Sequence, residues 1–181
     1  MNDFNSPNPE GRFKHRRYMC ASEQPKIEGY SCIASVRGGY VWQSGSINAE
    51  IFKIPRKLVV VQMEGTFCDH RAVHNGHNII AVITEAIEDA PNAVLPDNEY
   101  LALVDSIIAY LDNDFDAVIH CGMGISRSSY VTLGVLMRGT KLSFDEALRI
   151  LKEGRPVANP NAGFAAHVKR LESVLIGNQK L

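Results

Sequence analysis

The sequence predicts an α/β fold in which a mainly parallel central sheet is flanked by helices. Strand-like apolar runs alternate with stretches of helical spacing along most of the chain, which is typical of β–α–β units. The run KLVVVQM at residues 57–63 is almost continuously apolar and β-branched, as expected of a strand buried on both faces. The run DAVIH at residues 116–120 leads directly into a glycine-containing loop and then into a helical pattern.

Each element has a local signal in the sequence. Strands are expected at residues 31–36, 38–43, 57–63, 78–87 and 116–120. Helices are expected at residues 46–54, 97–114, 127–138, 143–154 and 164–175. The stretch 97–114 carries apolar residues along one helical face, and Asp97 after Pro96 suits an N-cap. Ser46 suits the N-cap of the short helix, and Ser143 with Glu146 forms a capping box.

The bulk composition describes one domain with no global charge signal. The 181 residues fit a single domain at residues 29–178, preceded by a loosely ordered tail at 1–28 that lacks periodicity. The net charge of −1 gives no global attraction to nucleic acid or to an anionic membrane, so neither is expected as a partner. The sequence shows no apolar run long enough for a membrane span and no secretory signal.

The cysteines favour a reduced environment. Their spacing matches no metal site, and without a signal segment they are expected to be reduced thiols. They are Cys20, Cys32, Cys68 and Cys121. We therefore expect a cytoplasmic protein, with the nucleus as the alternative location.

The loop after residue 120 combines a thiol with an anion-binding arrangement. Small residues that turn into a helix N-terminus direct successive backbone N–H groups inward, which makes a cradle for an anion. Arg127 adds a planar set of donors that suits phosphate oxygens. The same positive field stabilises the thiolate form of Cys121, so one loop binds a phosphate group and activates a nucleophile.

The segment HCGMGISRS at residues 120–128 matches the H-C-x5-R-S signature and resembles the cysteine-dependent protein tyrosine phosphatases. Its GISRS ending is most similar to the dual-specificity branch of that superfamily. The resemblance covers about residues 38–176, is weakest between 58 and 80, and includes the segments YVWQSGSINAE and LSFDEALRILKEGRPVANPNAGF. It implies a protein tyrosine phosphatase-like fold, with the phosphate-binding loop between a central strand and a helix.

The resemblance also implies a role for each residue of the loop. Cys121 attacks phosphorus and forms a cysteinyl-phosphate intermediate, and Ser128 hydrogen-bonds its sulfur and eases the departure of sulfur in the second step. The phosphate-binding residues are Gly122, Met123, Gly124, Ile125, Ser126 and Arg127. Supporting roles are expected for His120, behind the loop, and for Asn161, which would tie the PNAGF segment to it. Neither a metal nor an organic cofactor is needed.

A general acid must protonate the leaving oxygen as the thiolate attacks. The family carries an aspartate on a loop roughly thirty residues before the cysteine, and Asp89 occupies such a position directly after a predicted strand. Asp97 is the competing candidate, although its place at the start of a helix suggests a cap. We assign the acid to Asp89.

The expected partners are a phosphoprotein substrate and phosphate or another oxyanion in the loop. The sequence lacks a W-P-D acid loop, which implies a shallower pocket that admits phosphoserine and phosphothreonine as well as phosphotyrosine. An RNA 5′-triphosphatase is the enzymatic alternative, if a local basic patch forms from Arg16, Arg17, Arg37 and Lys53. A non-catalytic phosphate-binding scaffold is the other alternative. Cys68 is a candidate partner for Cys121 in a redox disulfide, with an ordinary loop thiol as the competing interpretation.

Overall fold

The central sheet has parallel strands in its interior and one antiparallel pair at its edge. The computed structural model describes residues 24–65 and 78–177 of the chain. The strands are β1 (Tyr30–Val36), β2 (Gly39–Ser44), β3 (Leu58–Gln62), β4 (Ile79–Thr84) and β5 (Asp116–His120). Their order in the sheet is β1-β2-β5-β3-β4. β5 is parallel to both β2 and β3, β3 is parallel to β4, and β1 pairs antiparallel with β2. The predicted mainly parallel sheet is confirmed.

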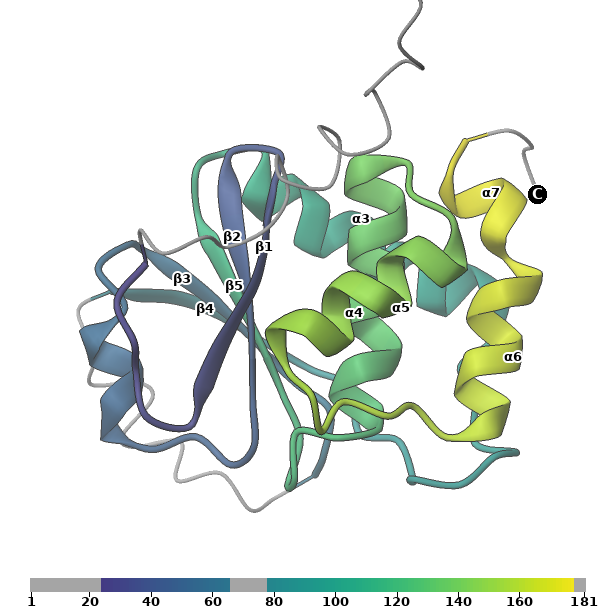
Figure 1. Ribbon diagram of the computed structural model, residues 1–181, viewed down its shortest axis with the longest axis horizontal. Coiled ribbons are helices and arrows are strands. Elements are labelled where there is room, and N and C mark those ends of the chain that lie inside the picture. The colour runs from purple at the N-terminus through teal and green to yellow at the C-terminus, as the bar shows by residue number, and fades with distance from the viewer. Residues whose placement is uncertain (1–23, 66–77, 178–181) are drawn as a thin grey trace, which may run out of the picture.

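Helices cover both faces of this sheet, as Figure 1 shows. The elements are η1 (Ala49–Lys53), α3 (Asp97–Leu111), α4 (Arg127–Thr140), α5 (Phe144–Gly154), α6 (Ala162–Arg170) and α7 (Glu172–Leu175). The larger helices gather on one face, and η1 lies on the other (the short blue helix in Figure 1). None of the helices within the described ranges is both long and apolar enough to cross a membrane.

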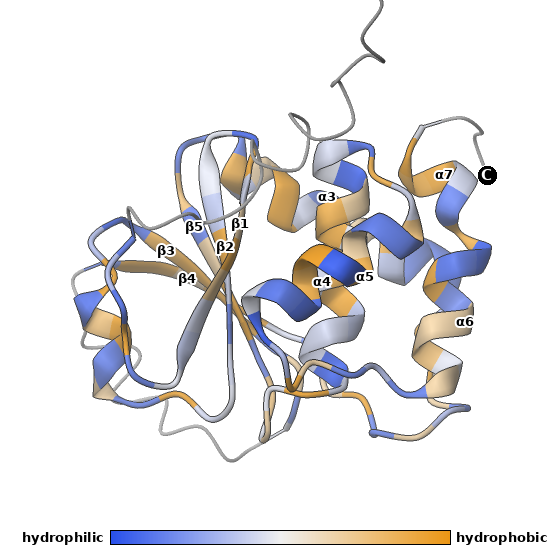
Figure 2. Cartoon of the chain, viewed as in Figure 1, coloured by the Kyte–Doolittle hydropathy of each residue, from blue (hydrophilic) through white to orange (hydrophobic). Residues whose placement is uncertain are grey.

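The sheet separates two hydrophobic cores, and Figure 2 shows the apolar strands between them. The larger core lies under the helices and includes three stacked aromatic rings, those of Tyr100, Tyr130 and Phe164. The smaller core lies under η1 around Trp42. Because β3 and β5 contribute to both cores, their side chains are buried on both faces, as the apolar runs predict.

Several boundaries differ from the sequence predictions. η1 is a short 3₁₀ helix capped by Asn48, and the expected cap Ser46 contacts the loop after β5 instead. The capping box of α5 is confirmed, whereas the predicted helix at 164–175 is divided at Leu171 into α6 and α7. The boundary at residue 28 between tail and domain stays a prediction, since residues 1–23 lie outside the described part.

Cys32 corrects the expectation of four reduced thiols, because it is disulfide-bonded. It lies half-buried on the edge strand β1. Cys121 is a free thiol. Cys68 lies outside the described residues, so its pairing with Cys121 stays a prediction.

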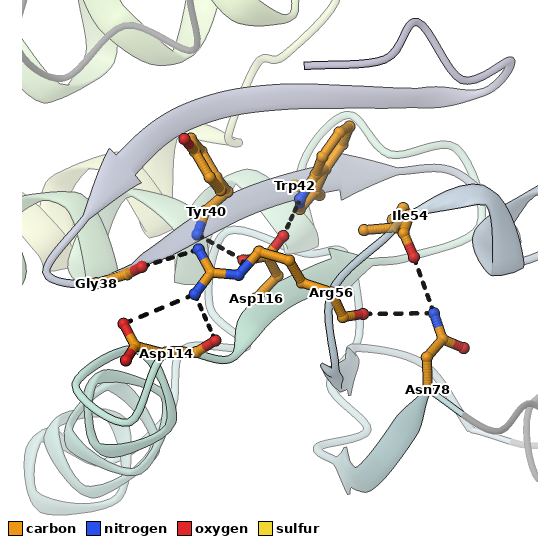
Figure 3. A network of polar contacts seen from close by, with 8 residues as sticks. All are labelled: Gly38, Tyr40, Trp42, Ile54, Arg56, Asn78, Asp114 and Asp116. Atoms are coloured by element: carbon orange, nitrogen blue, oxygen red, sulfur yellow. Dashed lines mark hydrogen bonds and ion pairs between the residues drawn. The ribbon is translucent and has the colours of Figure 1, made fainter. Parts of the chain in front are cut away.

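A buried carboxylate fixes the amino end of β5 (Figure 3). Asp116 accepts hydrogen bonds from the Tyr40 amide and the Trp42 indole, each at 3.0 Å, and pairs with Arg56 at 3.4 Å. Burial raises the pKa of Asp116, and these donors and the Arg56 charge oppose that shift. Arg56 also donates to the carbonyls of Gly38 and Asp114. The network joins three segments at the end of the sheet opposite Cys121, and so anchors the strand that carries the loop.

Candidate active site

The loop of residues 121–126 lies at the carboxyl end of β5 and leads into α4. Gly124 adopts a left-handed conformation with φ +64°, and a Cβ there would lie 2.4 Å from the Ser44 carbonyl oxygen. Only glycine therefore allows the loop to close against the end of β2. The parallel register explains this proximity, because Ser44 of β2 and Gln62 of β3 both pair with His120.

The outward side of the loop is held through its carbonyl groups. The Gly122 carbonyl accepts hydrogen bonds from the amide and hydroxyl of Ser46, at 3.1 and 3.2 Å. The carbonyls of Met123 and Gly124 accept from Arg155, at 3.4 and 2.7 Å, and the Ile125 carbonyl accepts from the Asn159 amide at 2.9 Å. Because each peptide unit is planar and trans, the outward carbonyls of Gly122, Gly124 and Ile125 direct the next N–H groups along the chain to the opposite, concave side, whereas the Gly124 N–H donates to the Cys121 carbonyl at 3.2 Å. This is the geometry of an anion cradle.

Arg155 is a contributor that sequence reasoning missed. Besides these carbonyls it contacts the Ser31 hydroxyl on β1 at 3.2 Å, so it links the loop to the sheet. Burial lowers the pKa of the Arg155 guanidinium, and the charge of the nearby Cys121 sulfur opposes this shift. Its cation thus lies behind the loop, on the side of the outward carbonyls.

The Cys121 sulfur is buried, with 2% of the residue exposed, and lies 3.3 Å from the Ser128 hydroxyl. The predicted contact between the two residues is therefore present. Gln43 of β2, which sequence reasoning also missed, bears on the orientation of the Ser128 hydroxyl. Its amide nitrogen donates to the Ser128 oxygen at 3.0 Å and also contacts the Ser129 hydroxyl and the Gly124 carbonyl. The Ser128 oxygen thus accepts from Gln43 and from the Cys121 thiol, and its own hydrogen can point at the sulfur once that sulfur is a thiolate.

Asn161 ties the PNAGF segment to the loop, as predicted, and Asp89 also reaches the loop. The Asp89 Oδ1 atom accepts from the Ser126 hydroxyl at 2.6 Å and from the Asn161 side-chain amide at 3.0 Å. The Asn161 backbone N–H donates to the Ser126 oxygen at 3.1 Å, and its side-chain oxygen caps α6 at the Phe164 amide. Both contacts to Asp89 use Oδ1, so a proton on this carboxyl group is directed to Oδ2.

Asp97 lies in a different network. It accepts two bonds from Arg170, at 2.8 and 2.6 Å, and one from the His167 Nε2 atom at 3.0 Å. These hydrogen bonds hold the pKa of Asp97 well below its usual range. The His167 ring in turn contacts the Tyr130 hydroxyl through Nδ1 at 2.6 Å. Asp97 therefore clamps α3 to α6, and it is the first residue of α3 rather than its cap.

Arg127 begins α4 with its guanidinium beside a carboxylate that the sequence did not indicate. Its Nη2 atom lies 3.3 Å from Glu64 Oε2, and its Nη1 atom lies 3.5 Å from the Ile87 carbonyl. His120 is fully buried at the end of β5, whereas Met123 is 71% exposed at the tip of the loop. Within residues 24–65 and 78–177, no three His, Cys, Asp or Glu side chains form a group that could hold a metal ion.

Comparisons with known proteins agree with this geometry. A family model described as "Dual specificity phosphatase, catalytic domain" matches residues 69–174. The mouse dual specificity protein phosphatase 18 is 28% identical over 134 residues, which cover 65% of this chain and 71% of that protein. The rat dual specificity protein phosphatase 15 is 44% identical over 52 residues, which cover 29% of this chain. This chain covers only 22% of the rat protein's length, and 10% of the similar human Slingshot homolog 3.

Solved structures show the same fold. A mouse dual specificity phosphatase, described as putative and complexed with zinc tungstate, matches with a TM-score of 0.70 at 20% identity, covering 88% of this chain and 96% of the other. A single-residue variant of human DUSP28 matches with a TM-score of 0.67 at 20% identity, covering 86% of this chain and 100% of the other.

Proposed function

The chain belongs to the dual specificity phosphatase family, and from that premise we propose that it hydrolyses phosphate monoesters of phosphoproteins through a cysteinyl-phosphate intermediate. The single observation that carries the proposal is the buried Cys121 sulfur beside the Ser128 hydroxyl, in a loop to which Asp89 is also tied. The nucleophile, the acid and the cationic Arg127 thus converge on one concave loop, as acyl- and phosphoryl-transfer sites require.

The first step forms the S–P bond as the P–O bond to the leaving group breaks. The inward N–H groups and Arg127 bind the equatorial oxygens and stabilise the charge that develops on them. The proton on Asp89 Oδ2 passes to the leaving oxygen, while the Ser126 and Asn161 donors keep Oδ1 in place. The dephosphorylated product leaves as a neutral alcohol or phenol.

The second step breaks the S–P bond by attack of water. Asp89 accepts a proton from the water, and inorganic phosphate leaves the loop. The Ser128 hydroxyl donates to the departing sulfur and stabilises it as a thiolate, because the Gln43 amide already occupies the serine oxygen. Arg155, which bonds the Met123 and Gly124 carbonyls from behind, holds the loop in shape through both steps.

Phosphoproteins are favoured over RNA by the positions of two basic residues. Arg37 pairs with Asp112 at 3.8 Å in the turn between β1 and β2, at the end of the sheet away from the loop. Lys53 pairs with Glu50 at 2.6 Å on η1. Arg37 is therefore too far along the sheet to join a basic patch at the loop, and Glu50 neutralises the charge of Lys53. The predicted contributions of Arg16 and Arg17 lie outside the described residues.

The test compares the reduced full chain with its Cys121→Ser variant on matched substrates. These are peptides carrying phosphotyrosine, phosphothreonine or phosphoserine, and a 5′-triphosphorylated RNA. We expect hydrolysis of the phosphopeptides that is lost in the variant. Faster hydrolysis of the RNA than of every peptide would establish the RNA alternative, and oxyanion binding without turnover would establish a scaffold.

A further inference from the structure

Glu64 lies at the mouth of the loop in a fixed position just after β3. Its carbonyl accepts a hydrogen bond from the Gln62 side chain at 2.8 Å, and the neighbouring Met63 amide donates to the His120 carbonyl at 3.0 Å. The segment is therefore attached to the end of β5, next to the nucleophile. Glu64 is 15% exposed at its side chain and pairs with Arg127, which is 20% exposed.

The pair uses only part of the Arg127 guanidinium. Glu64 takes one Nη2 hydrogen, and the Ile87 carbonyl contacts Nη1. The Nε atom is buried and has no hydrogen-bond partner among the described residues. On a guanidinium, Nε–H and one Nη2–H form an edge that binds two oxygens of a phosphate in parallel. Arg127 is thus held through both of its terminal nitrogens, and its buried Nε–H is left without a protein acceptor among the described residues.

Gly122 provides the space that this arrangement needs. A Cβ at Gly122 would lie 2.9 Å from the Glu64 Oε2 atom, so the carboxylate packs directly against the first residue after the nucleophile. A carboxylate in this place also repels a bound dianion. Its effect on anion binding therefore has two opposed parts, the repulsion and the orientation of Arg127.

We infer that Glu64 is a positioning residue, which holds Arg127 so that the Nε–Nη2 edge faces the phosphate, and that this orientation outweighs the repulsion. The inference rests on the proposed function of the loop as a phosphate site. It predicts that removal of the Glu64 charge weakens the binding of a tetrahedral oxyanion. A residue that acted only as a competing anion would have the opposite effect, since its removal would tighten binding.

The test is calorimetric titration of the reduced full chain with tungstate, which reports binding without turnover. We expect affinity about tenfold weaker in Glu64→Ala, with a smaller loss in Glu64→Gln, which keeps an acceptor oxygen. The control is Glu85→Gln, which removes the same charge at the same end of the sheet. The backbone amide of Glu85 donates to the Gln62 carbonyl, and the Glu85 side chain makes no ion pair with Arg127. The tungstate affinity of this control variant should therefore stay within about twofold of the wild type.

A second comparison separates positioning from loss of structure. In an Arg127→Lys background, which lacks the planar edge, Glu64→Ala should change tungstate affinity by less than about twofold. Tighter binding in Glu64→Gln, or an equal loss in both backgrounds, would overturn the inference. A chain that binds tungstate with the expected pattern but hydrolyses no phosphopeptide would refute the proposed function and leave the role of Glu64 intact.

Discussion

Replacing each candidate acid by its amide separates a catalytic carboxylate from a structural one. In Asp89→Asn, the side-chain oxygen still accepts from Ser126 and Asn161, because both existing bonds use one oxygen atom. The amide nitrogen that replaces Oδ2 cannot donate a proton as an acid. The variant should therefore keep its fold and its loop contacts while losing the proton transfer.

The size of each effect follows from these contacts. General acid catalysis contributes about 10²–10⁴ in rate, so we expect kcat on a phosphotyrosine peptide to fall by about 10²- to 10³-fold in Asp89→Asn. KM should change by less than about threefold, because the phosphate contacts persist. In Asp97→Asn, kcat should stay within about twofold, while the loss of charged bonds to Arg170 and His167 lowers stability by about 1–2 kcal/mol.

The difference in stability between the wild type and Asp97→Asn depends on pH. Because the pKa of Asp97 is lowered in the folded chain, its carboxylate contributes stability above its unfolded pKa, and this contribution is lost as the pH falls. The gap in Tm between the wild type and Asp97→Asn should therefore shrink below about pH 4. Steady-state kinetics and thermal melts of both variants provide the assay. A larger loss of kcat in Asp97→Asn than in Asp89→Asn would refute the assignment of the acid.

Three other substitutions test the framework around the loop. Gln43→Leu removes the donor that orients the Ser128 hydroxyl, so breakdown of the cysteinyl-phosphate should slow by about tenfold or more. Pre-steady-state kinetics would show this as a burst of product, whereas no burst and unchanged turnover would contradict the role of Gln43. Gly124→Ala forces a side chain against Ser44, so tungstate affinity should fall by at least about tenfold, and calorimetry that finds wild-type affinity would disprove the close approach. Asp116→Asn places an amide nitrogen against the Tyr40 and Trp42 donors, so the free energy of unfolding from chemical denaturation should fall by about 2–3 kcal/mol with kcat unchanged. A variant as stable as the wild type would contradict the role of this network.

The fold and the centre of the site follow from local sequence signals. The apolar runs of β3 and β5 indicated strands buried on both faces, and the parallel sheet confirms them. The spacing of Cys121, Arg127 and Ser128 within one loop and one helical turn needs no long-range information. Asp89 and Asn161 were placed through the family resemblance, and the structure brings both to Ser126.

The remaining contributors depend on contacts between distant segments. Gln43 and Glu64 lie 85 and 63 positions from the residues of α4 that they contact, Ser128 and Arg127. Neither shows a local signal, because a polar residue at the end of an apolar strand is also an ordinary surface residue. Their proximity results from the register that pairs the ends of β2 and β3 with the end of β5. Predicting them requires the strand order, which the periodicity of one sequence does not determine.

The covalent intermediate tests the account most directly. Rapid mixing of Ser128→Ala with p-nitrophenyl phosphate, followed by acid quenching and peptide mass spectrometry, should find phosphate on Cys121. A burst of about one nitrophenolate per chain should accompany it, because the sulfur leaves without the hydroxyl that stabilises it. Turnover that persists in Cys121→Ser, or a mapped phosphate on any other residue, would contradict the proposed chemistry.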